Sequence, residues 1–151
     1  MDMHEFYMGN VFDAYEFFGA YPTPDGTVFR TFAPSAERIT IIGEWNDWQE
    51  ENMIKDGHVW SYFSAKAKKG QMYKYVIYSS LGRVEHCDPY GFAMELRPNF
   101  ASIITDLDEY KFTDSEWLEK RSKNYNEPLN IYEVHIGSWH TDPDNENGWY
   151  S

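Results

Sequence analysis

Cysteine and basic residues are both scarce in this chain. Cys87 is the only cysteine among 151 residues, so an intramolecular disulfide is excluded and a reducing compartment is expected. Thirteen lysines and arginines stand against 25 aspartates and glutamates, which gives a formal net charge of -12. This balance opposes the positive footprint that phosphate backbones and anionic lipids require. Nucleic acid and membrane surfaces are therefore not expected as partners.

Several kinds of segment and motif are also missing. No apolar run approaches the length of a membrane span, and residues 1–5 show no basic stretch leading into an apolar one, so we expect a cytoplasmic protein. There is no glycine-rich phosphate loop and no Ser-His-Asp arrangement. His86, Cys87 and Asp88 are adjacent, but neighbouring residues on an extended segment point to alternating sides, and no second Cys/His pair completes a tetrahedral set. The sequence predicts neither a cofactor nor a metal site.

Aromatic residues, by contrast, are abundant. They make up 19% of the chain, an excess that suggests a β-rich fold or a stacking surface. The chain also has short segments in which apolar and polar residues alternate. These segments are residues 27–33, 38–43, 58–65 and 71–79, with a weaker one at 102–106, and turn-forming residues separate them. Regularly spaced short strands of this kind are typical of a β-sandwich, so the sequence predicts an all-β fold.

Two short helices are expected to flank this sandwich. One is predicted over residues 10–18, with Asn10 as its cap and Gly19 just past its end, and the other over about residues 115–122. After a linker at 124–128, residues 129–137 alternate again as a strand would. A strand of this quality needs partners at its edges, which the few polar residues after it do not supply.

The most informative stretch is Gly-Glu-Trp-Asn-Asp-Trp at residues 43–48, directly after a β-branched run. Asn46 and Asp47 are turn residues, so Trp45 and Trp48 flank a tight corner. An indole at the rim of a sheet offers a flat apolar face beside a polar N–H, which suits a sugar ring. Trp45 is expected to close the core. For Trp48, core packing and sugar stacking both remain open.

Lys74 is the second candidate for a binding role. It shares a strand face with Met72, Val76 and Tyr78, so its ammonium group is expected among apolar neighbours. Two interpretations are open: the ammonium extends to the edge of the sheet, or it lies on an exposed aromatic face and hydrogen-bonds a ligand hydroxyl.

Taken together, these segments resemble the N-terminal part of glycogen and starch branching enzymes, which belong to the α-amylase superfamily. The matching stretches are residues 14–20, 29–34, 43–48 and 73–75, followed by Asp-Pro-Tyr-Gly-Phe at 88–92, Arg97-Pro98, and Ile-Tyr-Glu-Val-His-Ile-Gly-Ser-Trp at 131–139. The first four are shared with other amylase-superfamily enzymes and with glycogen-binding regulatory subunits. The Asp-Pro-Tyr and Ile-Tyr-Glu-Val-His segments in this order are specific for branching enzymes.

The resemblance implies an immunoglobulin-like β-sandwich of the carbohydrate-binding kind, followed by a linker helix and the first strand of a truncated (β/α)8 barrel. The expected divisions are residues 1–24 as an N-terminal segment with a short helix, 25–107 as the sandwich, 108–128 as the linker and 129–151 as the start of the barrel. The parent enzymes cut an α-1,4-glucan and rejoin the piece through an α-1,6 bond. Their catalytic residues would lie beyond Ser151, so none is assigned here and the chain alone is expected to be inactive.

The resemblance also implies a glucan-binding set: Trp48 and Lys74, together with Trp45 and Asn46 of the same turn. The related regulatory subunits carry a second tryptophan in the next hairpin, but residues 82–86 hold no aromatic side chain. The expected partners are an α-glucan and the catalytic barrel. Two alternatives stay open: a freestanding glycogen-binding regulatory module, or a sandwich that binds no sugar and only supports the barrel.

Overall fold

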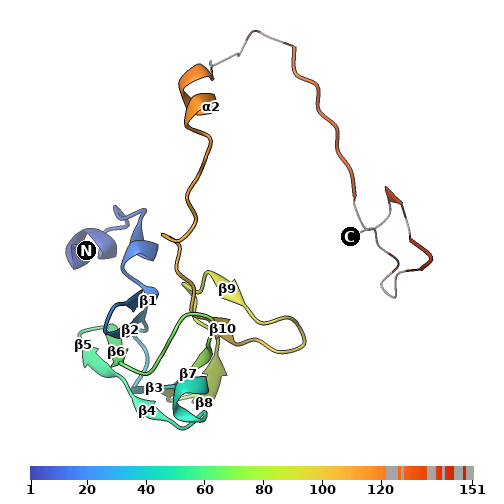
Figure 1. Ribbon diagram of the computed structural model, residues 1–151. Coiled ribbons are helices and arrows are strands. Elements are labelled where there is room, and N and C mark those ends of the chain that lie inside the picture. The colour runs from blue at the N-terminus through green and yellow to red at the C-terminus, as the bar shows by residue number, and fades with distance from the viewer. Residues whose placement is uncertain (122–125, 127, 136–138, 141, 145–147, 149–151) are drawn as a thin grey trace. The chain divides into compact units, whose positions relative to one another are not determined.

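Two antiparallel sheets form the larger of two compact units of the chain, Met1–Lys111; the other unit is Phe112–Ser151 (Figure 1). The computed structural model describes residues 1–121, 126, 128–135, 139–140, 142–144 and 148. The first sheet of the larger unit has the strand order β1-β2-β6-β5. The second sheet has the order β4-β3-β7-β10-β9, and β8 also pairs with β7.

The strands of the first sheet are β1 (Gly19–Thr23), β2 (Gly26–Phe32), β5 (Ile54–Asp56) and β6 (Val59–Ser64). Those of the second sheet are β3 (Arg38–Gly43), β4 (Glu51–Asn52), β7 (Met72–Ser79), β8 (Gly82–His86), β9 (Ala93–Met94) and β10 (Ser102–Ile103).

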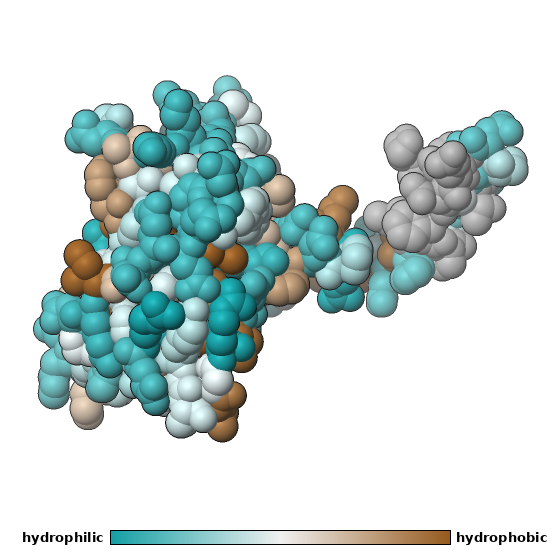
Figure 2. All heavy atoms as spheres, turned by 90° about the horizontal axis from the view of Figure 1, so that it is seen from below, coloured by the Kyte–Doolittle hydropathy of each residue, from teal (hydrophilic) through white to brown (hydrophobic). Residues whose placement is uncertain are grey.

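The core lies between the sheets and is rich in aromatic rings. In β2 burial alternates along the strand, so that Phe29 points inward, and its ring packs edge-on against Tyr73 of β7 with centroids 5.0 Å apart. The other large buried side chains of this core include Ile39, Ile41, Trp60, Tyr75 and Ile104. The prediction of an all-β sandwich is confirmed. Figure 2 shows that on one face the apolar side chains of this unit lie in separate patches between polar ones.

β7 changes partners along one of its edges, and this change positions the candidate site. On one side β7 pairs with β3 throughout, with Ile42 opposite Lys74. On the other side residues 72–73 pair with β10 and residues 75–79 pair with β8. Lys74 therefore stands at the gap between two different partner strands.

The N-terminal segment differs from its prediction. A helix over residues 10–18 is wrong: the α-helix is earlier, at α1 (Met3–Tyr7) with Asp2 as its cap, and only the short 3-10 helix η1 (Ala14–Glu16) lies in the predicted range. The reason is tertiary. Phe18 is fully buried against Phe6 and Tyr90, at centroid distances of 5.3 and 4.9 Å, and Gly19 already begins β1.

Strand β1 was not expected from the sequence, because it contains Gly19 and Pro22, which are depleted in strands. It pairs only with β2, from Gly19 opposite Arg30 to Thr23 opposite Gly26, so it is an edge strand. Proline is tolerated at such an edge because its missing N–H has no ladder partner to serve. The first sheet thus begins before residue 25.

In the second unit the helix is α2 (Ser115–Lys120); Arg121 already lies outside it, and residue 122 of the predicted range is outside the described residues. Residues 129–135, predicted as a strand, form no ladder, and residues 136–137 lie outside the described residues. Strand geometry is stabilised by ladder hydrogen bonds, and the described residues of this segment are in no ladder. Among the described residues, no helix has the length and apolar character needed to cross a membrane.

Candidate functional site

The turn after β3 is built around Asn46. Residues Glu44–Asn46 form the 3-10 helix η2, and the backbone N–H of Gly43 donates to Asn46 Oδ1 at 2.9 Å. The Trp48 N–H then donates to the Gly43 carbonyl at 2.9 Å, which closes the turn. Asp47 and Trp48 both have left-handed backbone angles, with φ of 54° and 58°. Asn46 therefore acts within the turn, as the residue that holds Trp48 in place.

Trp45 packs into the core, whereas Trp48 lies at the surface. Its indole stacks on Phe29 with centroids 5.1 Å apart and an interplanar angle of 29°, and it lies near Tyr62 and Tyr73. The ring also lies so close to Gly43 that a Cβ there would stand 2.4 Å from it. The expectation that Trp45 closes the core agrees with this packing, and the glycine is what gives the indole room.

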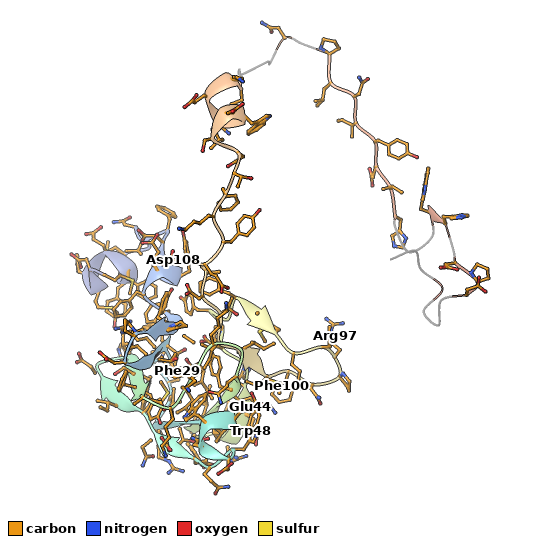
Figure 3. All side chains as sticks on the ribbon, in the orientation of Figure 1. Phe29, Glu44, Trp48, Arg97, Phe100 and Asp108 are labelled. Atoms are coloured by element: carbon orange, nitrogen blue, oxygen red, sulfur yellow. The ribbon has the colours of Figure 1, made fainter. Side chains whose placement is uncertain are left out.

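Trp48 is the tryptophan of this turn that faces solvent, with 39% of its surface exposed. The turn that carries it is tied to the sheet by Glu44, whose carboxylate accepts the Met72 N–H at the start of β7 at 2.8 Å. Trp48 and Glu44 are labelled in Figure 3, near the end of the second sheet. An aromatic ring is thus exposed on a backbone that is fixed on both sides.

The ammonium of Lys74 lies beside two aromatic rings, as the second of the two interpretations requires, while its hydrogen bond to a ligand hydroxyl stays a prediction. Its Nζ is 5.8 Å from the ring centre of Trp48 and 4.1 Å from that of Phe100, both within cation–π range. Glu85 of β8 neutralises it, with Oε2 at 3.5 Å. Only 19% of the Lys74 side chain is exposed, so the group is partly desolvated by these neighbours.

Phe100 is the member of this cluster that sequence reasoning missed. It lies in the connection between β9 and β10, just before Ser102 pairs with Tyr73 of β7, and 44% of its surface is exposed. Its position beside Lys74 follows from the partner change of β7, which places β10 and β8 on either side of that lysine. No periodicity in residues 95–101 signals it.

A buried polar cluster around Asp88 lies on the core side of β7, opposite the face that carries Lys74. The Asp88 carboxylate accepts hydrogen bonds from the hydroxyls of Tyr73 at 2.6 Å and Tyr75 at 3.1 Å, and from the Tyr90 N–H at 2.8 Å. Ser102 Oγ accepts the Asp88 N–H at 2.8 Å. Burial raises the pKa of Asp88 against the opposing effect of these hydrogen bonds, and burial beside that carboxylate raises the pKa of Tyr73 and Tyr75. The Asp-Pro-Tyr segment is therefore a structural tie between β7 and β10.

The cluster offers stacking and hydrogen bonding rather than a reactive pair. Among the described residues, no group of three or more His, Cys, Asp or Glu side chains is arranged to hold a metal ion. Asp88, of the adjacent set at residues 86–88, is committed to its tyrosine partners. The exposed rings, the ammonium and the neighbouring carboxylate suit a neutral ligand with apolar faces and hydroxylated edges.

Comparison with known proteins gives consistent matches. The model of carbohydrate-binding module 48 (isoamylase N-terminal domain) matches residues 17–91. The 1,4-alpha-glucan branching enzyme GlgB of Fusobacterium nucleatum subsp. nucleatum is 42% identical over 145 residues, which are 92% of this chain and 24% of that protein. The GlgB of Francisella tularensis subsp. novicida is 43% identical over 153 residues, with 93% and 24% covered. The chain thus spans 24% of the length of these curated relatives.

Solved structures share the fold at lower identity. Apo pullulanase from Paenibacillus barengoltzii has a TM-score of 0.62 at 24% identity, over 92% of this chain and 24% of that one. Ligand-free PulA from Klebsiella pneumoniae has a TM-score of 0.54 at 24% identity, over 64% and 10%. The resemblance read from the sequence motifs is confirmed: residues 17–91 are similar to carbohydrate-binding module 48, and the chain is similar over most of its length to part of the 1,4-alpha-glucan branching enzymes.

Proposed function

We propose that this chain is the carbohydrate-binding part of a 1,4-alpha-glucan branching enzyme and that its sandwich binds α-glucan at Trp48 and Lys74. The family match and the two GlgB relatives support the enzyme class. In this proposal residues 108–128 are a linker and residues 129–151 open the catalytic barrel, whose reaction transfers α-1,4-glucan segments to make α-1,6 branches. The glucan chemistry itself belongs to the barrel, and no residue of this chain is given a catalytic role.

The observation that carries the proposal is the exposed indole of Trp48 next to a held ammonium group. A flat ring fixed by a hydrogen-bonded turn loses little freedom when a sugar stacks on it. The Lys74 ammonium at 5.8 Å from the ring centre is a donor for hydroxyls at the edge of that sugar. Trp45 and Asn46 act through the turn: the one anchors it in the core and the other fixes its shape.

Titration of the chain with maltoheptaose, followed by calorimetry and tryptophan fluorescence, tests the proposal. We expect saturable binding that Trp48→Ala abolishes, since the variant removes the stacking face, and that Lys74→Met weakens. Phe63→Ala is the matched control, because Phe63 is an exposed aromatic residue (51%) on β6 of the other sheet. Absence of wild-type binding, or equal loss in the Phe63 variant, would reject the proposal and favour a sandwich that only supports the barrel.

A further inference from the structure

Phe100 is a second exposed ring beside Lys74. Strand β8, residues 82–86, carries no Trp, Tyr or Phe. Phe100 reaches the same lysine from the connection between β9 and β10, with its ring centre 4.1 Å from Lys74 Nζ. Trp48, on the turn after β3, is 5.8 Å from the same nitrogen. One ammonium group is therefore shared by two exposed rings from separate elements. Both rings are labelled in Figure 3.

The connection that carries Phe100 is braced by Glu95. The Glu95 N–H donates to the Ala101 carbonyl at 2.9 Å across the base of the connection. Its carboxylate accepts the Asn99 side-chain amide at 2.9 Å and the Ala101 N–H at 3.3 Å. These bonds fix the backbone on both sides of Phe100. A phenyl ring held in this way, with 44% of its surface exposed, is preorganised to receive a ligand.

We infer that Phe100 is a second stacking platform, which receives another glucosyl unit of the same α-glucan chain that stacks on Trp48. The inference rests on the proposed glucan binding at Trp48. It adds that the site selects glucans by their chain length. Lys74, whose Nζ lies within cation–π range of both rings and is paired with Glu85, would donate to hydroxyls of the segment that joins the two stacked units. The site would then prefer chains long enough to cover both rings.

A structural role for Phe100 gives different expectations. If its ring only shields the Lys74 ammonium, removing it would affect ligands of every length alike, because the change would act through Lys74 at the Trp48 end. If Phe100 is a platform, only ligands that reach it would lose affinity. The chain length of the probe therefore separates the two roles.

The experiment measures the affinities of maltose and maltoheptaose for the chain and for Phe100→Ala, Phe100→Leu and Phe100→Tyr. Because a stacked ring contributes roughly 1 kcal/mol, we expect Phe100→Ala to weaken maltoheptaose binding about fivefold and maltose binding less than twofold. Phe100→Leu keeps apolar bulk against Lys74 but lacks a flat ring, so it should fold and show the same selective loss. Phe100→Tyr should bind as wild type does.

Three outcomes decide the matter. Selective loss for maltoheptaose supports the second platform. Wild-type affinity in both Phe100→Ala and Phe100→Leu, or an equal loss of affinity for both sugars, overturns the second platform. In either case, loss of binding in Trp48→Ala would still support the proposed function. If wild type binds neither sugar, the proposed function itself is rejected and the platform with it. Thermal unfolding of each variant checks that its fold is kept.

Discussion

Gly43 shows how one missing side chain shapes the site. Its backbone is extended, with φ of -172°, so any residue could adopt its conformation. What requires glycine is the Trp45 indole, which occupies the space where a Cβ would be. The indole in turn fills the core beside Phe29 and fixes the turn from which Trp48 projects. A packing constraint inside the sandwich thus decides the position of a ring on its surface.

Gly43→Ala is therefore expected to destabilise the fold. The new methyl group would lie within 2.4 Å of the indole, so the ring or the turn must move, at a cost of about 1–3 kcal/mol. Urea unfolding measures this cost, and a parallel fall in maltoheptaose affinity would show that the turn has moved with the ring. Unchanged stability would mean that the Trp45 indole can repack without strain.

The roles of Lys74 and Phe100 illustrate the limits of sequence patterns for single residues. Alternation in β7 correctly places Lys74 on the face opposite Tyr73 and Tyr75, but it leaves two destinations for the ammonium. The choice depends on Glu85 and Phe100, which arrive from β8 and from the connection before β10. Their approach to Lys74 is a matter of strand pairing, which no local pattern encodes.

Strand β7 depends on Asp88 as well as on its ladders. The carboxylate joins two tyrosines of this strand to the segment before β9, and the Asp88 backbone is bonded to Ser102 of β10. The place where β7 changes partners is thereby fixed from inside the sandwich. Whatever loosens this tie should also loosen the surface above it, where Lys74 lies.

Asp88→Asn is expected to cost about 1–3 kcal/mol, because the amide cannot replace every acceptor and leaves a buried donor unpaired. The effect should depend on pH. The pKa of Asp88 is raised in the folded state. The stabilisation of the fold that results from this shift is fully present below the unfolded pKa of about 3.9 and is lost as pH rises through the folded pKa. The stability of wild type relative to the variant should therefore decrease with rising pH.

Urea unfolding of both proteins between about pH 4 and pH 7 measures this difference, a range that spans the shift expected for a buried carboxyl group. Asp108→Asn, at an exposed aspartate of the same unit, is the control for the substitution itself. A difference that grows with pH would contradict the direction of the Asp88 shift.

The strands that sequence reasoning predicted best are β2, β3, β6 and β7, which lie within or close to their predicted ranges. Burial alternates throughout β2, whereas β3 is buried from Ile39 to Gly43, but each strand is a short run of strand-forming residues bounded by turn residues. β1 and the N-terminal helix were mispredicted for a shared reason. Their backbone is decided by the burial of Phe18 and by an edge pairing with β2, and these tertiary contacts override the local propensities of residues 10–23.

The two compact units lead to a prediction about the chain as a unit of folding. The sandwich core and its hydrogen-bonded ladders all lie within Met1–Lys111, and the described residues 129–135 form no ladder. Deleting residues 129–151 should leave the melting temperature of the sandwich within about 3 °C of that of the whole chain, since stability follows the buried core. A large fall, seen by calorimetry, would show that the C-terminal residues take part in the core.

The sequence by itself determined the all-β sandwich, the turn that carries Trp48 and the resemblance to branching enzymes, because alternation, turn residues and local motifs are properties of neighbouring residues. Tertiary structure decided where Lys74 directs its charge, that Phe100 joins it, and that Asp88 is buried between two tyrosines. These features arise where β7 changes partners, so they depend on residues far apart in the chain that only the packed sheets bring together.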